Sequence, residues 1–319
     1  MKKTFLLFIS FCVSILTQAA TTITVGNLNY IIKDEVSVYV TSKPQSHYED
    51  AIISIPETVE YEGKTYTVTG IGNGAFLGCS ALASLSIPSS VTEIQSQAFL
   101  GCSSLASISL PENITSIESS TFFQCTSLKS IIIPSNVTKI GNKAFYNCKN
   151  LETISFNAGL VSIGESAFGM CSAISSIDIP ESVTSIGAGA FHQCTALTSA
   201  SLPSTLVEIG GNAFNNCKNM LTLYCKAAVP PTLLGYSVFG MIQVSNGKLY
   251  VPANSIDTYK TTNQWKDWGT VLELDEKTSI SSIEVTDHKC PTRKVLLGNR
   301  VVILKEGSVY SVNGVKHNK

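Results

Sequence analysis

A Phe-x-x-Cys unit returns every 23 residues along the middle of this 319-residue chain, and this period limits the possible folds more than any other feature. The unit occurs seven times, each time within a stretch similar to "AFLGCSSLASISLPENITSI". Its predicted core residues are Phe76, Phe99, Phe122, Phe145, Phe168, Phe191, Phe214, Cys79, Cys102, Cys125, Cys148, Cys171, Cys194 and Cys217. A fixed period of this length is typical of solenoids, in which stacked copies of one unit share a continuous core.

The apolar spacing within a unit predicts its local structure. From Phe99 the next two apolar positions follow at intervals of three, which favours a short helical or 3-10 turn. Ile108 and Leu110 are two residues apart, as in a strand, and Pro111 ends that strand because it has no N–H to donate. A second extended stretch follows, and in the later units a glycine there, such as Gly141, favours a tight corner. We therefore expect a β-rich repeat solenoid of parallel strands and short turns.

The repeat pattern AFxxCxxLxxIxIPxxVxxIG occurs as "AFYNCKNLETISFNAGLVSIG" and "AFHQCTALTSASLPSTLVEIG". It resembles the BspA-like leucine-rich repeats of surface and secreted proteins from bacteria of the Bacteroidetes type. The resemblance is strong over about residues 52–224. It implies a leucine-rich repeat solenoid, and adhesion to host or neighbouring-cell proteins, with matrix glycoproteins as the typical partners.

The ends of the chain differ from the repeats, and we predict five segments. The first has a basic start, an apolar run too short to span a bilayer and small residues at its end, as in a secretory signal peptide. We expect no integral membrane segment after its removal. The segments are a signal peptide at 1–20, an N-terminal β cap with a first irregular repeat at 21–69, the solenoid at 70–225, a C-terminal cap at 226–275, and a linker with a basic β tail at 276–319.

Both caps and the tail carry their own signals. Alternating apolar residues around turns at Gly26-Asn27, Asp34-Glu35 and Glu62-Gly63 predict hairpins in the N-terminal cap. In the C-terminal cap we expect a helix from about residue 255 to Trp268, whose aromatic side chains cover the last coil. The tail resembles the C-terminal sorting segments of proteins exported by the type IX machinery of Bacteroidetes. The alternatives are a solvated basic tail or strands packed on the cap.

Ten cysteines in an exported chain are usually read as a disulfide framework. Here seven of them occupy one repeat position, so stacking places them in one inward column. A disulfide framework requires bonds between adjacent coils and leaves an odd cysteine over. We predict buried thiols instead, because free cysteine behaves as a small hydrophobic residue. Cys225 fits a core position of a strand, whereas Cys290 fits either a surface or a buried thiol.

No constellation in the sequence predicts catalysis, a cofactor or a metal site. His192 and Cys194 invite comparison with a thiol protease, but position 192 varies among the repeats and points outward, whereas Cys194 points inward. The cysteines are too far apart in sequence for a zinc motif. A formal net charge of −1 predicts no bulk attraction to nucleic acid.

The outward strand positions form the candidate binding face, in two columns of mostly hydroxyl side chains in which Tyr224 is the only aromatic residue. Such columns pack well on a parallel ladder whether or not they bind a partner. The turns after each core phenylalanine offer further edge positions. The candidate residues are Ser107, Ser130, Ile132, Thr153, Ser155, Asp178, Ser199 and Tyr224 on the face, with Phe123, Tyr146 and His192 at the edge.

These features together predict a non-enzymatic, exported leucine-rich repeat protein at the cell surface or secreted. Its expected role is protein binding or adhesion, with an extracellular or host protein as partner. The alternatives are a structural envelope scaffold and an accessory that captures glycans.

Overall fold

The computed structural model describes residues 21–44 and 46–275, and beyond them only the backbone of four strands in the tail. The tail strands pair antiparallel in chain order: β22 (Thr292–Leu297), β23 (Arg300–Lys305), β24 (Ser308–Ser311) and β25 (Lys316–His317). The predicted signal peptide, the linker and Cys290 lie outside the described residues.

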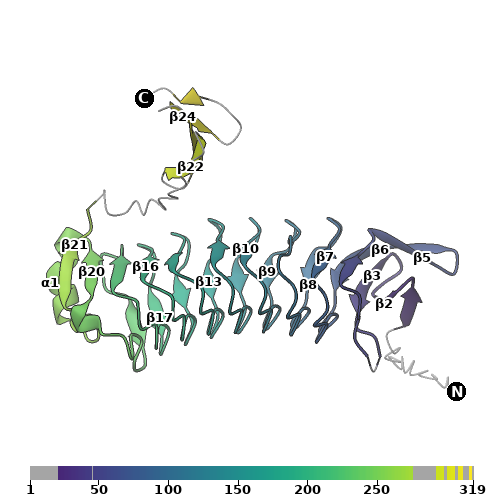
Figure 1. Ribbon diagram of the computed structural model, residues 1–319, viewed down its shortest axis with the longest axis horizontal. Helices are drawn as coiled ribbons and strands as arrows, with labels where there is room; N and C mark the ends of the chain where they lie inside the picture. Colours follow the sequence, from purple (N-terminus) through teal and green to yellow (C-terminus); the bar gives the residue numbers. More distant parts are fainter. Residues whose placement is uncertain are drawn as a thin grey trace, which may run out of the picture.

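The repeats form an elongated stack of coils between an N-terminal and a C-terminal cap (Figure 1). Most coils contribute a first strand, after the Phe-x-x-Cys turn, and a second strand, before the next such turn. The first strands are β4 (Ile52–Ser54), β7 (Ser84–Ser86), β10 (Ser130–Ile132), β12 (Thr153–Ser155), β14 (Ser176–Asp178), β16 (Ser199–Leu202) and β18 (Thr222–Cys225). The second strands are β6 (Lys64–Ile71), β8 (Glu93–Ile94), β9 (Ser116–Ile117), β11 (Lys139–Ile140), β13 (Ser162–Ile163), β15 (Ser185–Ile186), β17 (Glu208–Gly210) and β19 (Thr232–Leu234).

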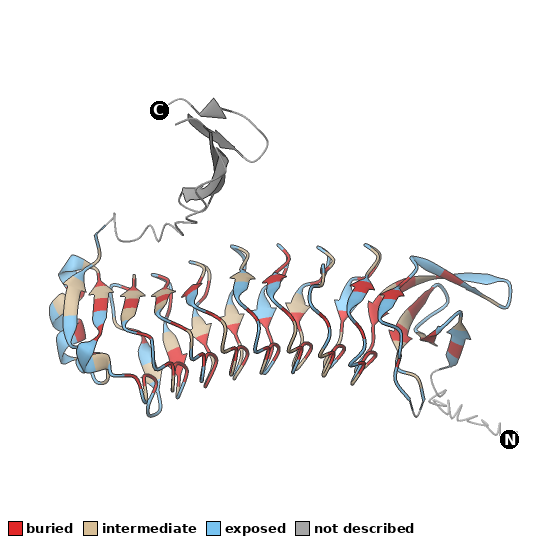
Figure 2. Ribbon diagram, viewed as in Figure 1, coloured by how far each residue is buried: buried red, intermediate tan, exposed pale blue. Residues whose placement is uncertain are grey.

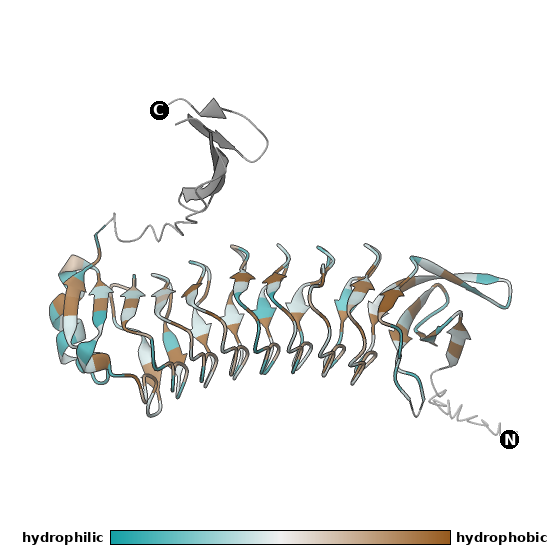
Figure 3. Cartoon of the chain, viewed as in Figure 1, coloured by the Kyte–Doolittle hydropathy of each residue, from teal (hydrophilic) through white to brown (hydrophobic). Residues whose placement is uncertain are grey.

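Equivalent strands of neighbouring coils pair in parallel, as the repeat predicts. Ser130 is opposite Thr153 in the first strands, and Ser162 is opposite Ser185 in the second strands, each pair 23 residues apart. Hydropathy changes from residue to residue along these short strands (Figure 3). The predicted β-solenoid is therefore confirmed.

The first strands do not form one continuous ladder, which corrects the simplest expectation from the repeat. They fall into separate sheets, β4–β7, β10–β12 and a longer sheet that begins at β14. The predicted strand at Ile108–Leu110 is absent, although the Lys129 N–H still donates to the Ala106 carbonyl of that coil. Strands of three residues lie at the lower limit of strand length, so a small change of backbone direction ends the pairing.

The N-terminal cap contains the predicted hairpins. β1 (Thr22–Val25), β2 (Leu28–Ile32) and β3 (Ser37–Thr41) pair antiparallel, and β5 (Thr58–Tyr61) pairs antiparallel with β6. β3 then pairs in parallel with β6, and β6 with β8. This chain of pairings joins the cap directly to the first coils.

The C-terminal cap continues the first-strand sheet through β20 (Lys248–Val251) and β21 (Thr270–Glu273), with short 3-10 turns at Val244–Asn246 and Ala253–Ser255. The predicted long helix is wrong, because α1 spans only Ile256–Thr261. The hydroxyl groups of Thr261 and Thr262 donate to carbonyls one turn back, and the backbone is extended at Thr262. Side chains that bond the backbone in this way compete with helix continuation.

A column of stacked phenylalanine rings forms the centre of the core. Buried residues recur from coil to coil along the stack (Figure 2). The seven rings are 0% exposed, and the centroids of neighbouring rings lie 5.1–5.6 Å apart with interplanar angles of 2–17°. Tyr48 closes the column at the N-terminal end, 5.3 Å from Phe76. At the other end Phe239 continues it, and Trp265 and Trp268 pack against the Phe239 ring in T-shaped arrangements. The tryptophans are therefore core residues of the cap.

A second column, of thiols, runs beside the rings. All seven repeat cysteines and Cys225 are free and buried. From Cys102 to Cys217, each thiol donates to the carbonyl of the phenylalanine in the preceding coil, at S···O distances of 3.1–3.2 Å. Each cysteine thus both fills space and bonds one coil to the next.

The glycines at the ends of the second strands allow the backbones of neighbouring coils to approach closely. They do not form the tight corner that the sequence predicts. Gly141, Gly164, Gly187 and Gly210 have no positive φ. A Cβ added at Gly187 would lie 2.6 Å from backbone atoms of Gly164 and Glu165 in the coil before it. Neighbouring backbones therefore approach too closely there for any side chain.

Candidate functional site

The outward side chains of the first strands, and of the equivalent residues 107–109 where no strand forms, lie on one surface, which we call the strand face. The face residues Ser107, Ser130, Ile132, Thr153, Ser155 and Asp178 are exposed, and Ser199 and Tyr224 are partly buried. Two isoleucines interrupt the hydroxyl columns: Ile132 is 70% exposed, and Ile52 in β4, opposite Ser84 in β7, is 76% exposed. The structure therefore brings these predicted residues onto a single solvent-facing surface.

The strand face continues into the C-terminal cap, which the sequence analysis missed. Tyr250 in β20 lies opposite Tyr224 in β18, and the two rings stack with centroids 4.9 Å apart and planes 20° apart. Leu272 in β21 is the next residue in this column. Tyr224 is therefore half of an aromatic pair. The sequence signal for this pair is the Leu-Tyr dipeptide, which begins at Leu223 and again at Leu249. The two copies are 26 residues apart, so a search at the 23-residue period does not align them.

The tyrosine pair offers both apolar area and hydroxyl groups. Partial burial raises the pKa of Tyr224, and the neighbouring Tyr250 adds to the effect. The phenol therefore stays protonated at neutral pH and is able to donate a hydrogen bond. Tyrosines in such positions are frequent binding hot spots, because one ring combines large contact area with a polar tip.

The three predicted edge residues also come together, and we call them the turn-edge strip. Phe123 and Tyr146 stack with centroids 5.1 Å apart, and the His192 ring lies 5.6 Å from Tyr146 across an intervening coil. All three side chains are partly buried, so position 192 is not simply outward as expected. The His192 Nδ1 atom donates to the Gly189 carbonyl at 2.7 Å.

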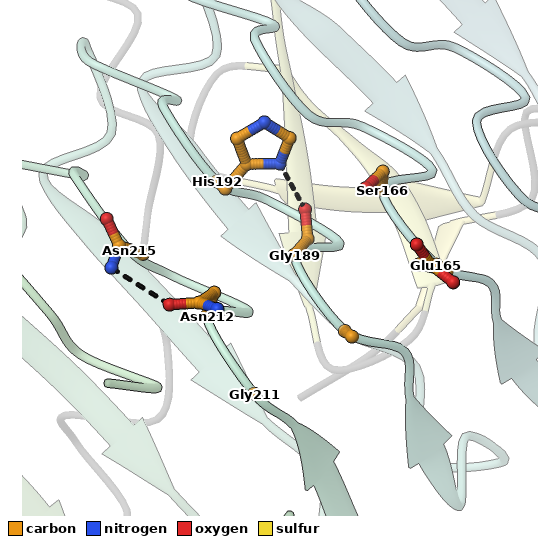
Figure 4. A pocket seen from close by; sticks show the side chains of 8 residues that line it. Glu165, Ser166, Gly189, His192, Gly211, Asn212 and Asn215 are labelled. Atoms are coloured by element: carbon orange, nitrogen blue, oxygen red, sulfur yellow. Dashed lines mark hydrogen bonds between the residues drawn. The ribbon is translucent and has the colours of Figure 1, made fainter. Parts of the chain in front are cut away.

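A hollow lies beside His192, at the turns of three successive coils (Figure 4). Its volume is about 350 Å³. Glycine and alanine residues line part of it, and the other lining residues are Glu165, Ser166, His192, Asn212 and Asn215. The hollow is open to solvent, and Glu165 is the one charged side chain in its lining. It therefore offers hydrogen-bonding groups without a strong electrostatic potential.

The histidine and cysteine that invite comparison with a thiol protease do not form a catalytic pair. Cys194 is fully buried, and its thiol donates to the Phe168 carbonyl at 3.2 Å. Burial raises the pKa of this thiol well above its ordinary value. A thiol without a base and with a raised pKa is a poor nucleophile. Among residues 21–44 and 46–275 no group of three or more metal-ligating side chains occurs.

The sequence matches the family described as BspA type leucine rich repeat region, in six copies over residues 58–175 and 115–243. These matches together cover more than half of the chain. The chain belongs to the BspA-type leucine-rich repeat family. No curated protein matches it significantly.

Solved structures of other bacterial repeat proteins resemble this BspA-type chain in fold. A leucine rich cell surface protein from Faecalibacterium prausnitzii has a TM-score of 0.51 at 17% identity, over 82% of this chain and 97% of its own. A leucine-rich repeat protein from Bacteroides ovatus has a TM-score of 0.48 at 23% identity, over 79% and 76%. The leucine-rich repeat protein of T. pallidum has a TM-score of 0.44 at 27% identity, over 61% and 78%.

The BspA-type repeats account for the core, whereas the candidate binding residues lie where individual copies differ. In the residues that the structure describes, no helix is long and apolar enough to cross a membrane. The family and fold are those of repeat scaffolds, and a scaffold by itself does not name a ligand. The strand face and the turn-edge strip therefore have to be weighed by their own chemistry.

Proposed function

We propose that the protein is exported and binds an extracellular or host protein through its strand face, as an adhesion module of the BspA type. The observation that carries this proposal is the stacked Tyr224–Tyr250 pair on a surface otherwise lined with small hydroxyl side chains. Aromatic anchors surrounded by small polar groups are typical of the centres of protein interfaces.

The scaffold supports this use of the face. Its strands are held by the stacked core beneath them, so a partner meets side chains that are already ordered, and this reduces the entropic cost of association. The short serine and threonine side chains leave the tyrosine rings, Ile52 and Ile132 as prominent apolar groups of the strand face. Such a surface suits a partner that lies across several coils.

Export forms part of the proposal and rests on residues 1–20, which have the pattern of a signal peptide. The segment division at residues 69, 225 and 275 is retained, with caps that close both ends of the solenoid. The tail at 276–319 is proposed as a sorting segment. A surface or secreted location is consistent with membership of the BspA-type family.

The proposal predicts that the tyrosine pair dominates binding. The mature chain should bind saturably to at least one immobilised matrix or mucus glycoprotein, measured by biolayer interferometry. Exchange of both Tyr224 and Tyr250 for serine should weaken that binding about tenfold or more, because it removes a hot spot of at least ~1.4 kcal/mol.

Tyr236 provides the matched control, since it is 90% exposed and follows β19, away from the first strands. Tyr236→Ser should leave the affinity unchanged. The adhesion proposal would be refuted if the mature chain bound none of the matrix and mucus proteins saturably. Equal affinities of the double variant and the parent would show that the tyrosine pair does not carry the binding.

A further inference from the structure

The turn-edge strip contains a local departure from the repeat at Gly169. In all six of the remaining Phe-x-x-Cys units, the position after the core phenylalanine carries a side chain. These residues are Leu77, Leu100, Phe123, Tyr146, His192 and Asn215. A Cβ at Gly169 would lie 2.4 Å from His192 Cε1 and 3.1 Å from Tyr146 Cδ2. The imidazole therefore occupies the space that a side chain at position 169 would fill.

This placement of His192 explains the hollow beside it. The ring extends across the coil of Gly169 toward Tyr146, so it does not stack on Asn215 in the following coil. The space between His192 and Asn215 remains open, and small residues such as Gly189 and Gly211 line its base. The departure at Gly169 thus creates a cavity that an uninterrupted ladder of side chains would close.

The polar groups around the hollow are only partly used by the protein itself. Asn215 Nδ2 donates to Asn212 Oδ1 at 3.0 Å, which leaves Asn215 Oδ1 as an acceptor and Asn212 Nδ2 as a donor (Figure 4). His192 uses only Nδ1, in its bond to Gly189. Within the described part of the chain, the Glu165 carboxylate and the Ser166 hydroxyl have no side-chain hydrogen bond. Donors and acceptors of four kinds therefore converge on one open space.

We propose that this hollow binds a neutral saccharide unit. A pyranose ring presents C–H groups on its faces and hydroxyl groups, each both donor and acceptor, around its rim. The imidazole of His192, with the Tyr146 ring behind it, provides a flat surface for the C–H face, as aromatic side chains do for apolar groups. The amides, the hydroxyl and the carboxylate suit the rim, because each sugar hydroxyl is able both to donate and to accept.

The lining favours this ligand over a peptide side chain or an acidic sugar. A lysine or arginine side chain only donates hydrogen bonds, so it would leave the Asn212 Nδ2 donor unused. An acidic sugar would be repelled by the same carboxylate. No aliphatic side chain other than alanine lines the hollow, so an apolar peptide anchor would contact only the alanine methyl group and the His192 ring and would leave the rim amides unused. The volume of about 350 Å³ lies at the lower end of the range for small-ligand sites.

The site is independent of the proposed adhesion surface, because it uses the turns and not the strand face. It binds the same chemistry whether the saccharide is free or attached to a glycoprotein. Because it is open to solvent, we expect weak binding, with a Kd on the order of 1 mM for one or two sugar units.

The test is saturation-transfer NMR and titration of the mature chain with three neutral probes, lactose, maltotriose and N,N′-diacetylchitobiose, and with 3′-sialyllactose as acidic comparison. At least one neutral probe should saturate below about 20 mM, and 3′-sialyllactose should bind more weakly. A glycoprotein carrying the bound sugar, compared with its enzymatically deglycosylated form, shows whether attached glycans are also recognised.

Three variants test the geometry. Gly169→Ala should displace the His192 ring toward the hollow and weaken binding about tenfold, and Asn215→Ala should weaken it about fivefold by removing one rim contact. Ser199→Ala on the strand face is the control and should bind as the parent does. The proposal would be overturned if none of the three neutral probes bound saturably. It would also be overturned if Gly169→Ala and Asn215→Ala both bound with the affinity of the parent. The Tyr224 and Tyr250 variants should retain saccharide binding, so either proposal is able to fail alone.

Discussion

Replacement of Phe145 by alanine is expected to lower the free energy of unfolding by about 3–5 kcal/mol. The Phe145 ring lies 5.2 Å from Phe122 and 5.1 Å from Phe168, almost parallel to both, and is 0% exposed. Its removal leaves a cavity in the middle of the column and deprives two further rings of their stacking partner. In a solenoid each coil is stabilised mainly by its neighbours, so a central defect weakens two interfaces at once.

Phe123→Ala is the matched control for this variant. Phe123 is the residue after a core phenylalanine in the preceding unit and is partly exposed, so its loss should cost about 1 kcal/mol or less. Urea unfolding followed by far-UV circular dichroism measures both variants. Similar losses for Phe145→Ala and Phe123→Ala would contradict the account of the ring column as the principal core.

Alkaline pH should unfold the protein. Burial raises the pKa of the thiols of Cys79, Cys102, Cys125, Cys148, Cys171, Cys194 and Cys225 above the ordinary value of 9.0. Cys171 reaches about 12 and Cys225 about 11. The stability that these thiols contribute is complete below pH 9 and is lost as the pH rises toward the folded-state pKa values.

The sign follows from proton counting. Above pH 9 the unfolded chain releases thiol protons that the folded chain still holds, so the unfolded state binds fewer protons and the free energy of unfolding falls with pH. Each such thiol contributes a slope of up to about 1.4 kcal/mol per pH unit, reached when the unfolded thiol is ionised and the folded one is not. Seven thiols together exhaust a typical stability of about 5–15 kcal/mol within one or two pH units.

The expected result is a cooperative loss of β-structure between about pH 10 and pH 11, followed by circular dichroism. In Cys148→Ala, the pH dependence of the unfolding free energy should be weaker, by about half a proton at pH 9 and by about one proton at pH 10, whatever the stability of this variant at pH 7. A free energy of unfolding that stays constant from pH 8 to pH 11 would contradict buried, unreactive thiols.

The repeat in the sequence was sufficient to predict the solenoid and its core. Phe122 and Cys125 are one of seven Phe-x-x-Cys pairs that recur at the same period. A residue that is the same in every coil packs against its equivalent in the next coil, so its recurrence marks it as part of the core. The hairpins of the N-terminal cap were also predictable, because Gly26, Asp34-Glu35 and Gly63 mark tight turns between alternating strands. Period and turn chemistry are local signals, and the fold is built from local contacts between neighbouring units.

The remaining features depend on contacts that the period does not encode. The end of α1 is set by hydroxyl bonds from Thr261 and Thr262 to nearby carbonyls, which helical spacing of the tryptophans does not reveal. The break of the first-strand ladder at Ser107–Ser109 has no counterpart in the sequence pattern, which is complete there. In both places the local backbone conformation departs from the one that the spacing of apolar residues predicts.

The candidate site was predictable only in part. The edge position was identified from the variation among Phe123, Tyr146 and His192, but the contact of His192 with Tyr146 across Gly169 requires knowledge of the spacing between coils. Tyr250 was missed because the last coil is longer than 23 residues, so a strict period misaligns it. Functional differences of this kind appear where copies of the repeat diverge, and a single sequence gives no measure of which divergence matters.

Alkylation of the native protein at pH 8, with each cysteine-containing peptide identified by mass spectrometry, tests the central claim most directly. The account predicts that the eight cysteines from Cys79 to Cys225 remain unmodified in the folded protein, all react after denaturation, and none is recovered as a disulfide. Rapid native labelling of the repeat cysteines, or disulfide-linked peptides from neighbouring coils, would show that the shared column of rings and thiols does not exist.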